Sequence, residues 1–128
     1  MRLWHIDLLS KLPQKQICGQ WRECAALMGN GWGRKHATVD YVFLYPEEYL
    51  VAFSMYVFKD MIRRGYHPNH EVIFNSLLKR HTNQEVIDIC QKAEQLIQDN
   101  SKLFYEHNDN YMQECLDNLK SKGITIDF

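Results

Sequence analysis

The spacing of apolar residues is the feature that most constrains how this chain can fold. Large apolar side chains recur every three or four residues in segments of helical length, and residues that begin or end helices separate these segments. The pattern predicts helices over about residues 13–29, 46–64, 69–80, 82–100 and 108–123. We therefore expect an all-α fold in which residues 1–128 form a single compact helical domain of about five helices with short extended termini.

Individual residues support these boundaries. Thr82 and Glu85 have the spacing of a capping box, in which each side chain accepts a hydrogen bond from the other residue's backbone N–H. Asn108 is of a type favoured at the start of a helix. Gly123 is of the type favoured just after the end of one. We expect the last two helices to begin and end at these residues.

The two chain ends lie outside the helical pattern. Residues 1–9 are rich in large apolar side chains, which predicts an extended segment packed on the core. Residues 124–128 alternate between apolar and polar side chains, as a strand does. We expect this second segment to lie near the first.

The chain lacks the sequence signals of a membrane or secreted protein. No apolar run approaches the roughly 20 residues that a membrane-spanning helix needs, and the first residues lack the apolar core of a signal peptide. We therefore expect a cytoplasmic protein. The four cysteines show no paired spacing, which predicts reduced and mostly buried thiols.

Charge is unevenly distributed although the net charge is only −1. Residues 1–36 carry six lysine and arginine residues against two acidic ones, whereas residues 81–128 carry four against nine. A basic first third is typical of a surface that binds an anionic partner, and it also arises by chance on a solvated surface. The sequence fits both interpretations.

Arg22 and Glu23 stand beside the apolar stripe of the first predicted helix. Gly19, one turn earlier, costs about 1 kcal/mol in a helix relative to alanine, so we expect another group to approach the helix closely there. That group is either a ligand or a neighbouring helix. The short first segment can bring the α-amine of Met1 to the same place. The charged pair is then either part of a catalytic set or a structural ion pair.

A loop rich in glycine and basic residues follows this helix. Trp32 lies between two glycines and is expected to be exposed, and Arg34, Lys35 and His36 follow it. Basic and aromatic side chains on a flexible loop suit contacts with a phosphate backbone. The alternative is an ordinary solvated loop.

The histidines give no clear metal signal. We expect His5 and His36 to be hydrogen-bonded structural residues. A metal site made of His5, Glu23 and His36 is not expected, because the sequence has no tight ligand spacing. The remaining histidines are predicted to be surface groups: His67, His70, His81 and His107.

Four short motifs together resemble a known family. They are residues 1–4 (Met-Arg-Leu-Trp), 21–23 (Trp-Arg-Glu), 34–36 (Arg-Lys-His) and 63–66 (Arg-Arg-Gly-Tyr). Their order and spacing resemble the pyrimidine-dimer DNA glycosylases, which are typified by the phage endonuclease V enzymes and their bacterial relatives. The resemblance covers roughly residues 1–66, and it identifies the predicted domain as an endonuclease V-like helical domain.

This resemblance implies a DNA-repair glycosylase with abasic-site lyase activity. In that family the amino-terminal α-amine attacks C1′ of the damaged nucleotide's sugar and forms a Schiff base, the base departs, and β-elimination nicks the strand. The catalytic positions fall on Met1, Glu23 and Arg22. The partner implied is damaged double-stranded DNA, with no cofactor and no metal. The candidate DNA-binding residues are Arg2, Trp32, Arg34, Lys35 and His36.

Elementary chemistry supports the same assignment. An imine forms only from a neutral amine, and an α-amine has a pKa of about 7.7–8.0 against about 10.4 for lysine. A carboxylate such as Glu23 can stabilise a cationic sugar or imine and carry protons. An arginine such as Arg22 can bind a phosphate with two parallel hydrogen bonds.

The chain also departs from the phage enzymes. Arginine at position 2 should prevent removal of the initiator, so that Met1 itself supplies the amine. Ala26 stands where those enzymes have a further arginine, the aromatic and basic carboxyl tail is absent, and the last third is acidic. A non-catalytic relative that binds nucleic acid or a protein through residues 34–36 is therefore the main alternative. An all-α enzyme of other chemistry is the third.

Overall fold

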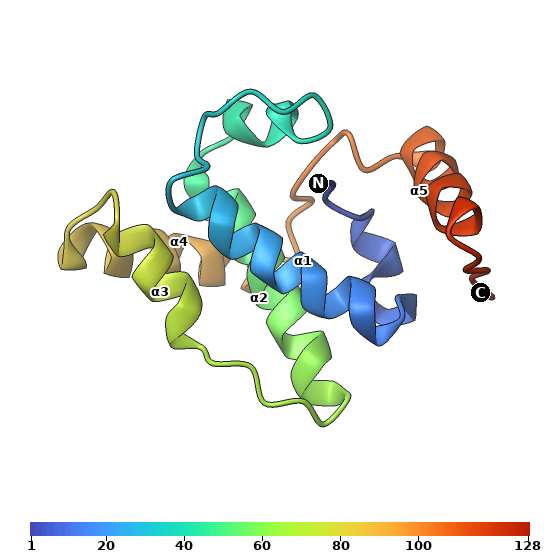
Figure 1. Cartoon of the computed structure of the whole chain (residues 1–128). Helices are drawn as coiled ribbons and strands as arrows, with labels where there is room; N and C mark the ends of the chain where they lie inside the picture. The colour runs from blue at the N-terminus through green and yellow to red at the C-terminus, as the bar shows by residue number, and fades with distance from the viewer.

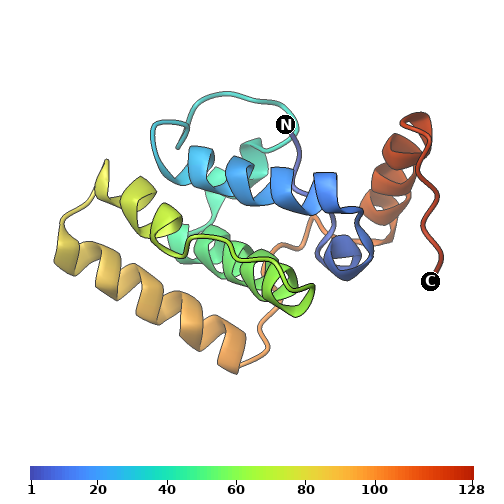
Figure 2. The ribbon, with the colours of Figure 1, turned by 60° about the horizontal axis from the view of Figure 1, so that its bottom comes forward.

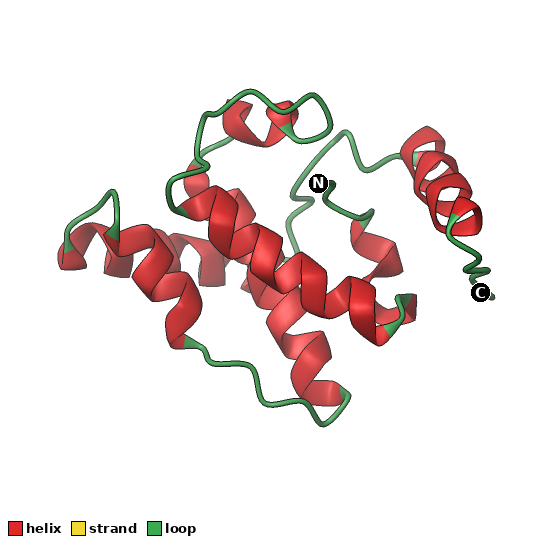
Figure 3. Ribbon diagram, viewed as in Figure 1, coloured by secondary structure: helices red, strands yellow, loops and turns green.

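The computed structural model describes all residues from Met1 to Phe128 and contains five α-helices, two 3₁₀ helices and no strand (Figures 1 and 3). The predicted all-α fold is confirmed. In chain order the elements are η1 (Ile6–Lys11), α1 (Gln14–Met28), η2 (Asp40–Leu44), α2 (Glu47–Arg63), α3 (Glu71–Leu78), α4 (Asn83–Gln98) and α5 (Asp109–Ser121). None of these helices is long and apolar enough to cross a membrane.

Local hydrogen bonds explain where the last two helices begin. The Thr82 side chain accepts from the Glu85 backbone N–H, and the Glu85 carboxylate accepts from the Thr82 N–H at 2.9 Å, so the predicted capping box is confirmed. The Asn108 side chain accepts from the N–H of Tyr111 at the start of α5. Gly123, with a φ of 81°, follows the end of that helix, as expected for a residue that tolerates the left-handed region.

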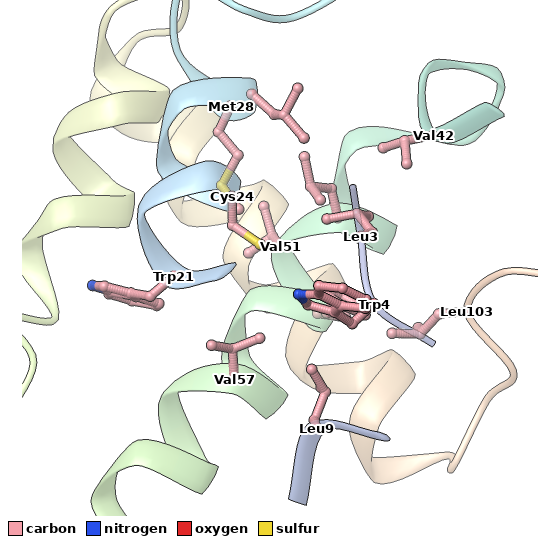
Figure 4. Packing of buried hydrophobic residues seen from close by; sticks show 14 of the residues in the cluster. Leu3, Trp4, Leu9, Trp21, Cys24, Met28, Val42, Val51, Val57 and Leu103 are labelled. Atoms are coloured by element: carbon pink, nitrogen blue, oxygen red, sulfur yellow. The ribbon is translucent and has the colours of Figure 1, made fainter. Parts of the chain in front are cut away.

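The core forms around α2, which lies between α1 on one side and α4 on the other (Figure 2). α3 packs against α1 and α4. Figure 4 shows apolar side chains of α1 and α2 meeting those of the amino-terminal segment, residues 1–5, and of η1. Leu3 and Trp4 are buried there, so this short segment is part of the core.

The structure corrects both predictions for the chain ends. The first extended segment ends at residue 5 rather than residue 9, because residues 6–11 turn into η1, where the His5 ring accepts from the Asp7 N–H at 3.1 Å. The carboxyl-terminal segment forms no strand. A strand there would need free backbone groups on a partner, and side chains of α1 and α5 already bind those of the amino-terminal segment.

α5 stands apart from the other helices and joins them chiefly through the amino-terminal segment (Figure 1). The Tyr111 hydroxyl donates to the Leu3 carbonyl, and the Arg2 guanidinium lies 3.1 Å from a Glu114 carboxylate oxygen. At the far end of the helix, the Lys122 ammonium lies 5.4 Å from the centre of the Trp4 ring. The first residues therefore link α5 to the helical core.

The prediction of four surface histidines is wrong for His107. Its ring is buried, its Nδ1 accepts from the Ile6 N–H at 3.1 Å, and its Nε2 lies 2.8 Å from the Tyr41 hydroxyl. It also stacks on Tyr111, with ring centres 5.2 Å apart. Burial lowers the pKa of His107 to about 3, so the ring is neutral.

His81 is also more than a surface group, because its half-buried ring lies 2.8 Å from the Glu47 carboxylate. His5 is buried and caps η1, as expected for a structural histidine. All four cysteines are free thiols, and Cys24 and Cys115 are buried.

Candidate active site beside the amino terminus

A pocket of about 210 Å³ opens beside the amino terminus. Its wall is drawn from the amino-terminal segment, α1, the loop before η2, and α5 with the residue that follows it. The residues that line it are Met1, Arg2, Trp4, Glu23, Thr38, Asn118 and Lys122. The structure therefore brings Met1 and Glu23 together, whereas Arg22 does not line the pocket.

The position of Glu23 follows from the periodicity of α1. Ile17, Trp21 and Cys24 turn the apolar stripe of the helix toward the core, and Glu23 falls at the edge of that stripe, where it is half-buried. Burial raises the pKa of Glu23. The amino-terminal amine opposes this shift most, followed by a backbone hydrogen bond from Arg2 and by the charges of Lys122 and Arg22.

The amino-terminal segment is held in place at successive residues. The Thr38 hydroxyl donates to the Met1 carbonyl, and the Tyr111 hydroxyl donates to the Leu3 carbonyl. The buried side chain of Gln20 bonds to the backbone of Arg2 and Trp4 from the side of α1. With the backbone of residues 1–4 fixed, the Met1 amine has little freedom to leave the pocket.

Arg22 lies outside the pocket on the exposed surface of α1. Its Nη2 is 3.8 Å from the position that a Cβ on Gly19 would take, and no other group approaches that position within 4 Å. No neighbouring helix therefore packs at Gly19. Arg22 and Glu23 do not form an ion pair either, since the ion pairs of the molecule join other residues. The two structural explanations for this stretch are wrong.

The glycine-rich loop is split between buried and exposed side chains. Trp32 is half-buried rather than exposed. Its ring packs edge-on against Phe43, with ring centres 4.9 Å apart, and its ring centre lies 5.2 Å from the Arg80 guanidinium. Residues 34–36 are exposed. The His36 backbone N–H donates to Asp40 at 2.7 Å, which folds the loop back toward η2.

A short hydrogen-bonded path connects this loop to the amino terminus. The His36 Nδ1 lies 3.0 Å from the Thr38 hydroxyl oxygen, and the same hydroxyl donates to the Met1 carbonyl. In this arrangement the His36 ring donates to Thr38, because the hydroxyl proton is already used. Thr38 therefore links the basic loop to the pocket.

The sequence interpretation missed several residues of the site. Gln20 carried a signal, since a glutamine stood between Ile17 and Cys24 at a position of the buried stripe, where an amide must find partners. Lys122 carried no signal, because its place beside Trp4 depends on how α5 packs against the first residues. Thr38 and Tyr111 carried no signal, because their roles depend on distant segments meeting at Met1 and Leu3.

No group of three or more His, Cys, Asp or Glu side chains is arranged to hold a metal ion. The pocket itself offers the Met1 amine, one carboxylate and the cations of Arg2 and Lys122. This set can transfer protons, bind an anionic group and present a primary amine to an electrophile.

Comparison with known proteins identifies the family of the chain. A family profile described as pyrimidine dimer DNA glycosylase matches residues 1–74, which is more than half of the chain and includes Met1, Arg2, Glu23 and the basic loop. Searches of curated proteins and of solved structures gave no match. The family supports a role in DNA repair, with DNA as the substrate. The chain thus belongs to the pyrimidine dimer DNA glycosylase family.

Proposed function

We propose that this protein is a DNA-repair glycosylase with abasic-site lyase activity and that the α-amine of Met1 is its nucleophile. The observation that carries the proposal is the shared pocket of Met1 and Glu23 in a chain of this family. Met1 is 44% exposed, so its amine remains accessible to a sugar entering the pocket. Glu23 is half-buried beside it.

The proposed reaction begins at C1′ of the damaged nucleotide. The amine lone pair forms a bond to C1′ while the bond from C1′ to the base breaks, and the base leaves with the bonding pair and takes up a proton. The amine then loses one proton, its lone pair forms the second bond to C1′ as the C1′–O4′ bond breaks, O4′ takes up a proton, and a protonated Schiff base forms. Removal of a C2′ proton and departure of the 3′ phosphate from C3′ complete the β-elimination.

Glu23 is proposed to carry the protons of these steps. A carboxyl whose pKa is raised by burial changes its protonation state closer to neutral pH than an exposed one does, which suits a group that both accepts and donates protons. In its ionised form it also stabilises the cationic imine. Arg22, outside the pocket, is proposed to bind a phosphate at the pocket's rim.

The damaged double-stranded DNA is proposed to lie across the pocket and the basic loop. Arg34, Lys35 and His36 are exposed and suited to phosphate contacts, and Arg2 and Lys122 place cations in the pocket wall. The damaged nucleotide, or the base opposite it, must leave the stack before C1′ can reach Met1. Trp32, held against Phe43, is proposed to support the loop beneath this contact.

Borohydride trapping tests the proposal. The protein is incubated with duplex DNA containing one abasic site, reduced with borohydride, digested, and analysed by mass spectrometry. We expect a covalent adduct on the Met1 nitrogen, and we expect prior acetylation of the amino terminus to abolish it. Unmodified DNA is the control for the abasic site. Protein acetylated at surface lysines but not at the amino terminus is the control for acetylation.

The outcomes separate the competing functions. An adduct that survives acetylation of the amino terminus would identify a lysine as the nucleophile and overturn the assignment of Met1. DNA binding without any adduct would establish the non-catalytic alternative.

A further inference from the structure

The Gln20 side chain hydrogen-bonds both to the amino-terminal segment and to Glu23. Its Oε1 accepts from the Trp4 backbone N–H at 2.7 Å, and its Nε2 donates to the Arg2 carbonyl at 3.1 Å. The same Nε2 donates to Oε2 of Glu23 at 3.2 Å. Gln20 and Glu23 are three residues apart on α1 and therefore share one face of the helix.

The partners of Gln20 determine how its amide is oriented. A backbone N–H needs an acceptor and a backbone carbonyl needs a donor, so the oxygen must face Trp4 and the nitrogen must face Arg2. The second hydrogen on Nε2 then points to Glu23. Gln20 is only 1% exposed, which excludes water from competing for these bonds.

We propose that Gln20 is a positioning residue that holds the amine-bearing segment and the Glu23 carboxylate on the same turn of α1. This inference rests on the proposed function and adds a fixed orientation of the Glu23 carboxylate. Oε2 accepts from the Gln20 amide, so the carboxylate is held in one orientation beside Met1 in the pocket. The buried amide of Gln20 then fixes the distance between the proposed nucleophile, the Met1 amine, and the proposed proton carrier, the Glu23 carboxylate.

The charge of the side chain at position 20 matters because Glu23 already lies among charged groups. The Met1 amine, Lys122 on the α5 side and Arg22 on its own helix all favour its ionised form, and a backbone hydrogen bond from Arg2 does the same. A neutral amide binds a donor, a carbonyl and a carboxylate without adding charge. A carboxylate at position 20 would repel Glu23 and could not donate to Arg2 while ionised.

Two substitutions at this position separate positioning from simple stability. Gln20→Met keeps the size and removes every hydrogen bond, and Gln20→Glu keeps the shape but brings a second carboxylate to Glu23. Gln91→Met, on the exposed surface of α4, is the matched control. Single-turnover strand cleavage of abasic DNA is measured against pH for each, together with kcat, KM and the folded fraction.

We expect Gln20→Met to lower kcat by about 10- to 100-fold at near-constant KM, since a misplacement of about 1 Å can cost up to 10²-fold. We expect Gln20→Glu to move the pH dependence of cleavage toward higher pH, because two neighbouring carboxylates resist ionising together. Carbon-13 NMR of the Glu23 carboxyl in the DNA-free protein should show the same upward shift. Gln91→Met should match the wild type in each measurement.

A wild-type kcat in folded Gln20→Met, or an unchanged Glu23 titration in Gln20→Glu, would overturn the inference. A loss of activity that only follows the folded fraction would also overturn it, because that result describes a purely structural residue. If the proposed function itself is wrong, the wild-type protein will give no Met1 adduct, and neither will the variants at position 20. That result is distinct from a failure of the inference about Gln20. The NMR titration tests the contact between Gln20 and Glu23 even in that case.

Discussion

The amino-terminal segment has two different sides. Its open side is the pocket with Met1 and Glu23, and its sealed side is the buried contact with His107. On the open side the half-buried Glu23 faces a pocket with the exposed Met1. On the sealed side the buried His107 uses both ring nitrogens, one on Ile6 and one on Tyr41. Burial is the largest cause of the pKa shift in both residues.

The difference lies in access to solvent and substrate. Glu23 can change its protonation state, since the pocket leaves room for a reacting group beside it. His107 cannot take up a proton near neutral pH without losing the acceptor for Ile6, and burial raises the pKa of its neighbour Tyr111 to about 12. In the proposed mechanism, the partial burial of Glu23 thus serves proton transfer, whereas the complete burial of His107 serves the attachment of α5 to the first residues.

The largest effect is expected on the open side, from Glu23→Gln. This change removes the proton carrier and the negative charge but keeps the shape, so strand cleavage should fall by about 10²- to 10⁴-fold. DNA binding should be largely retained. Cleavage kinetics with abasic duplex DNA measure the effect, and Glu71→Gln, on the exposed first turn of α3, is the matched control. Equal losses in the two variants would contradict the role of Glu23.

The sealed side should be visible in the pH dependence of stability. Because the pKa of His107 is about 3 in the folded state and about 6.5 when unfolded, only the unfolded state binds this proton between those values. The contribution of His107 to the free energy of unfolding is therefore fully present above about pH 6.5. It falls by about 1.4 kcal/mol per pH unit as the pH decreases toward 3.

Urea unfolding between pH 7 and 5 measures this slope before most carboxylates titrate. In His107→Gln, which cannot ionise there, the slope should flatten, although the variant should be less stable at pH 7. His5, whose pKa is also lowered chiefly by burial, adds a smaller contribution of the same sign. If stability depended on pH in His107→Gln as it does in the wild type, His107 would not be the cause of the loss of stability in acid.

The basic loop extends the open side and gives a smaller effect. Reversing the charges of Arg34 and Lys35 to glutamate should weaken DNA binding at low salt and reduce the slope of log K against log salt by about 2, since two phosphate contacts are lost. Helix content should not change. Reversing Lys92, exposed on α4, is the control. Unchanged affinity at low salt would remove the loop from the proposed DNA footprint.

The smallest effect is expected from Lys122→Met. Its ammonium favours the ionised form of Glu23, so its removal should raise the pKa of Glu23 further and move the pH profile of cleavage upward. Because three other groups also favour ionisation, we expect only a few-fold change in rate at neutral pH. Lys120→Met, exposed two residues earlier in the last turn of α5, should behave as the wild type.

The periodicity of apolar residues by itself determined the helices and much of the core. The first predicted helix, over about residues 13–29, is α1 (Gln14–Met28), and the capping box at Thr82 begins α4 where predicted. These features depend on residues three or four positions apart, which hydrogen-bond or pack within one helix. The same local logic placed Glu23 at the edge of a buried stripe.

Only the tertiary structure decided which side chains surround Glu23. Lys122 lies about a hundred positions away in the sequence, and no local pattern indicates that α5 returns to the first residues. The burial of His107 likewise depends on Ile6 and Tyr41 meeting it from other segments. Arg22 stands next to Glu23 in the sequence yet lies outside the pocket, because successive residues of a helix point about 100° apart. Residues close together in the chain govern helix formation. A site depends instead on how distant segments pack, and their separation in the sequence does not indicate their distance in space.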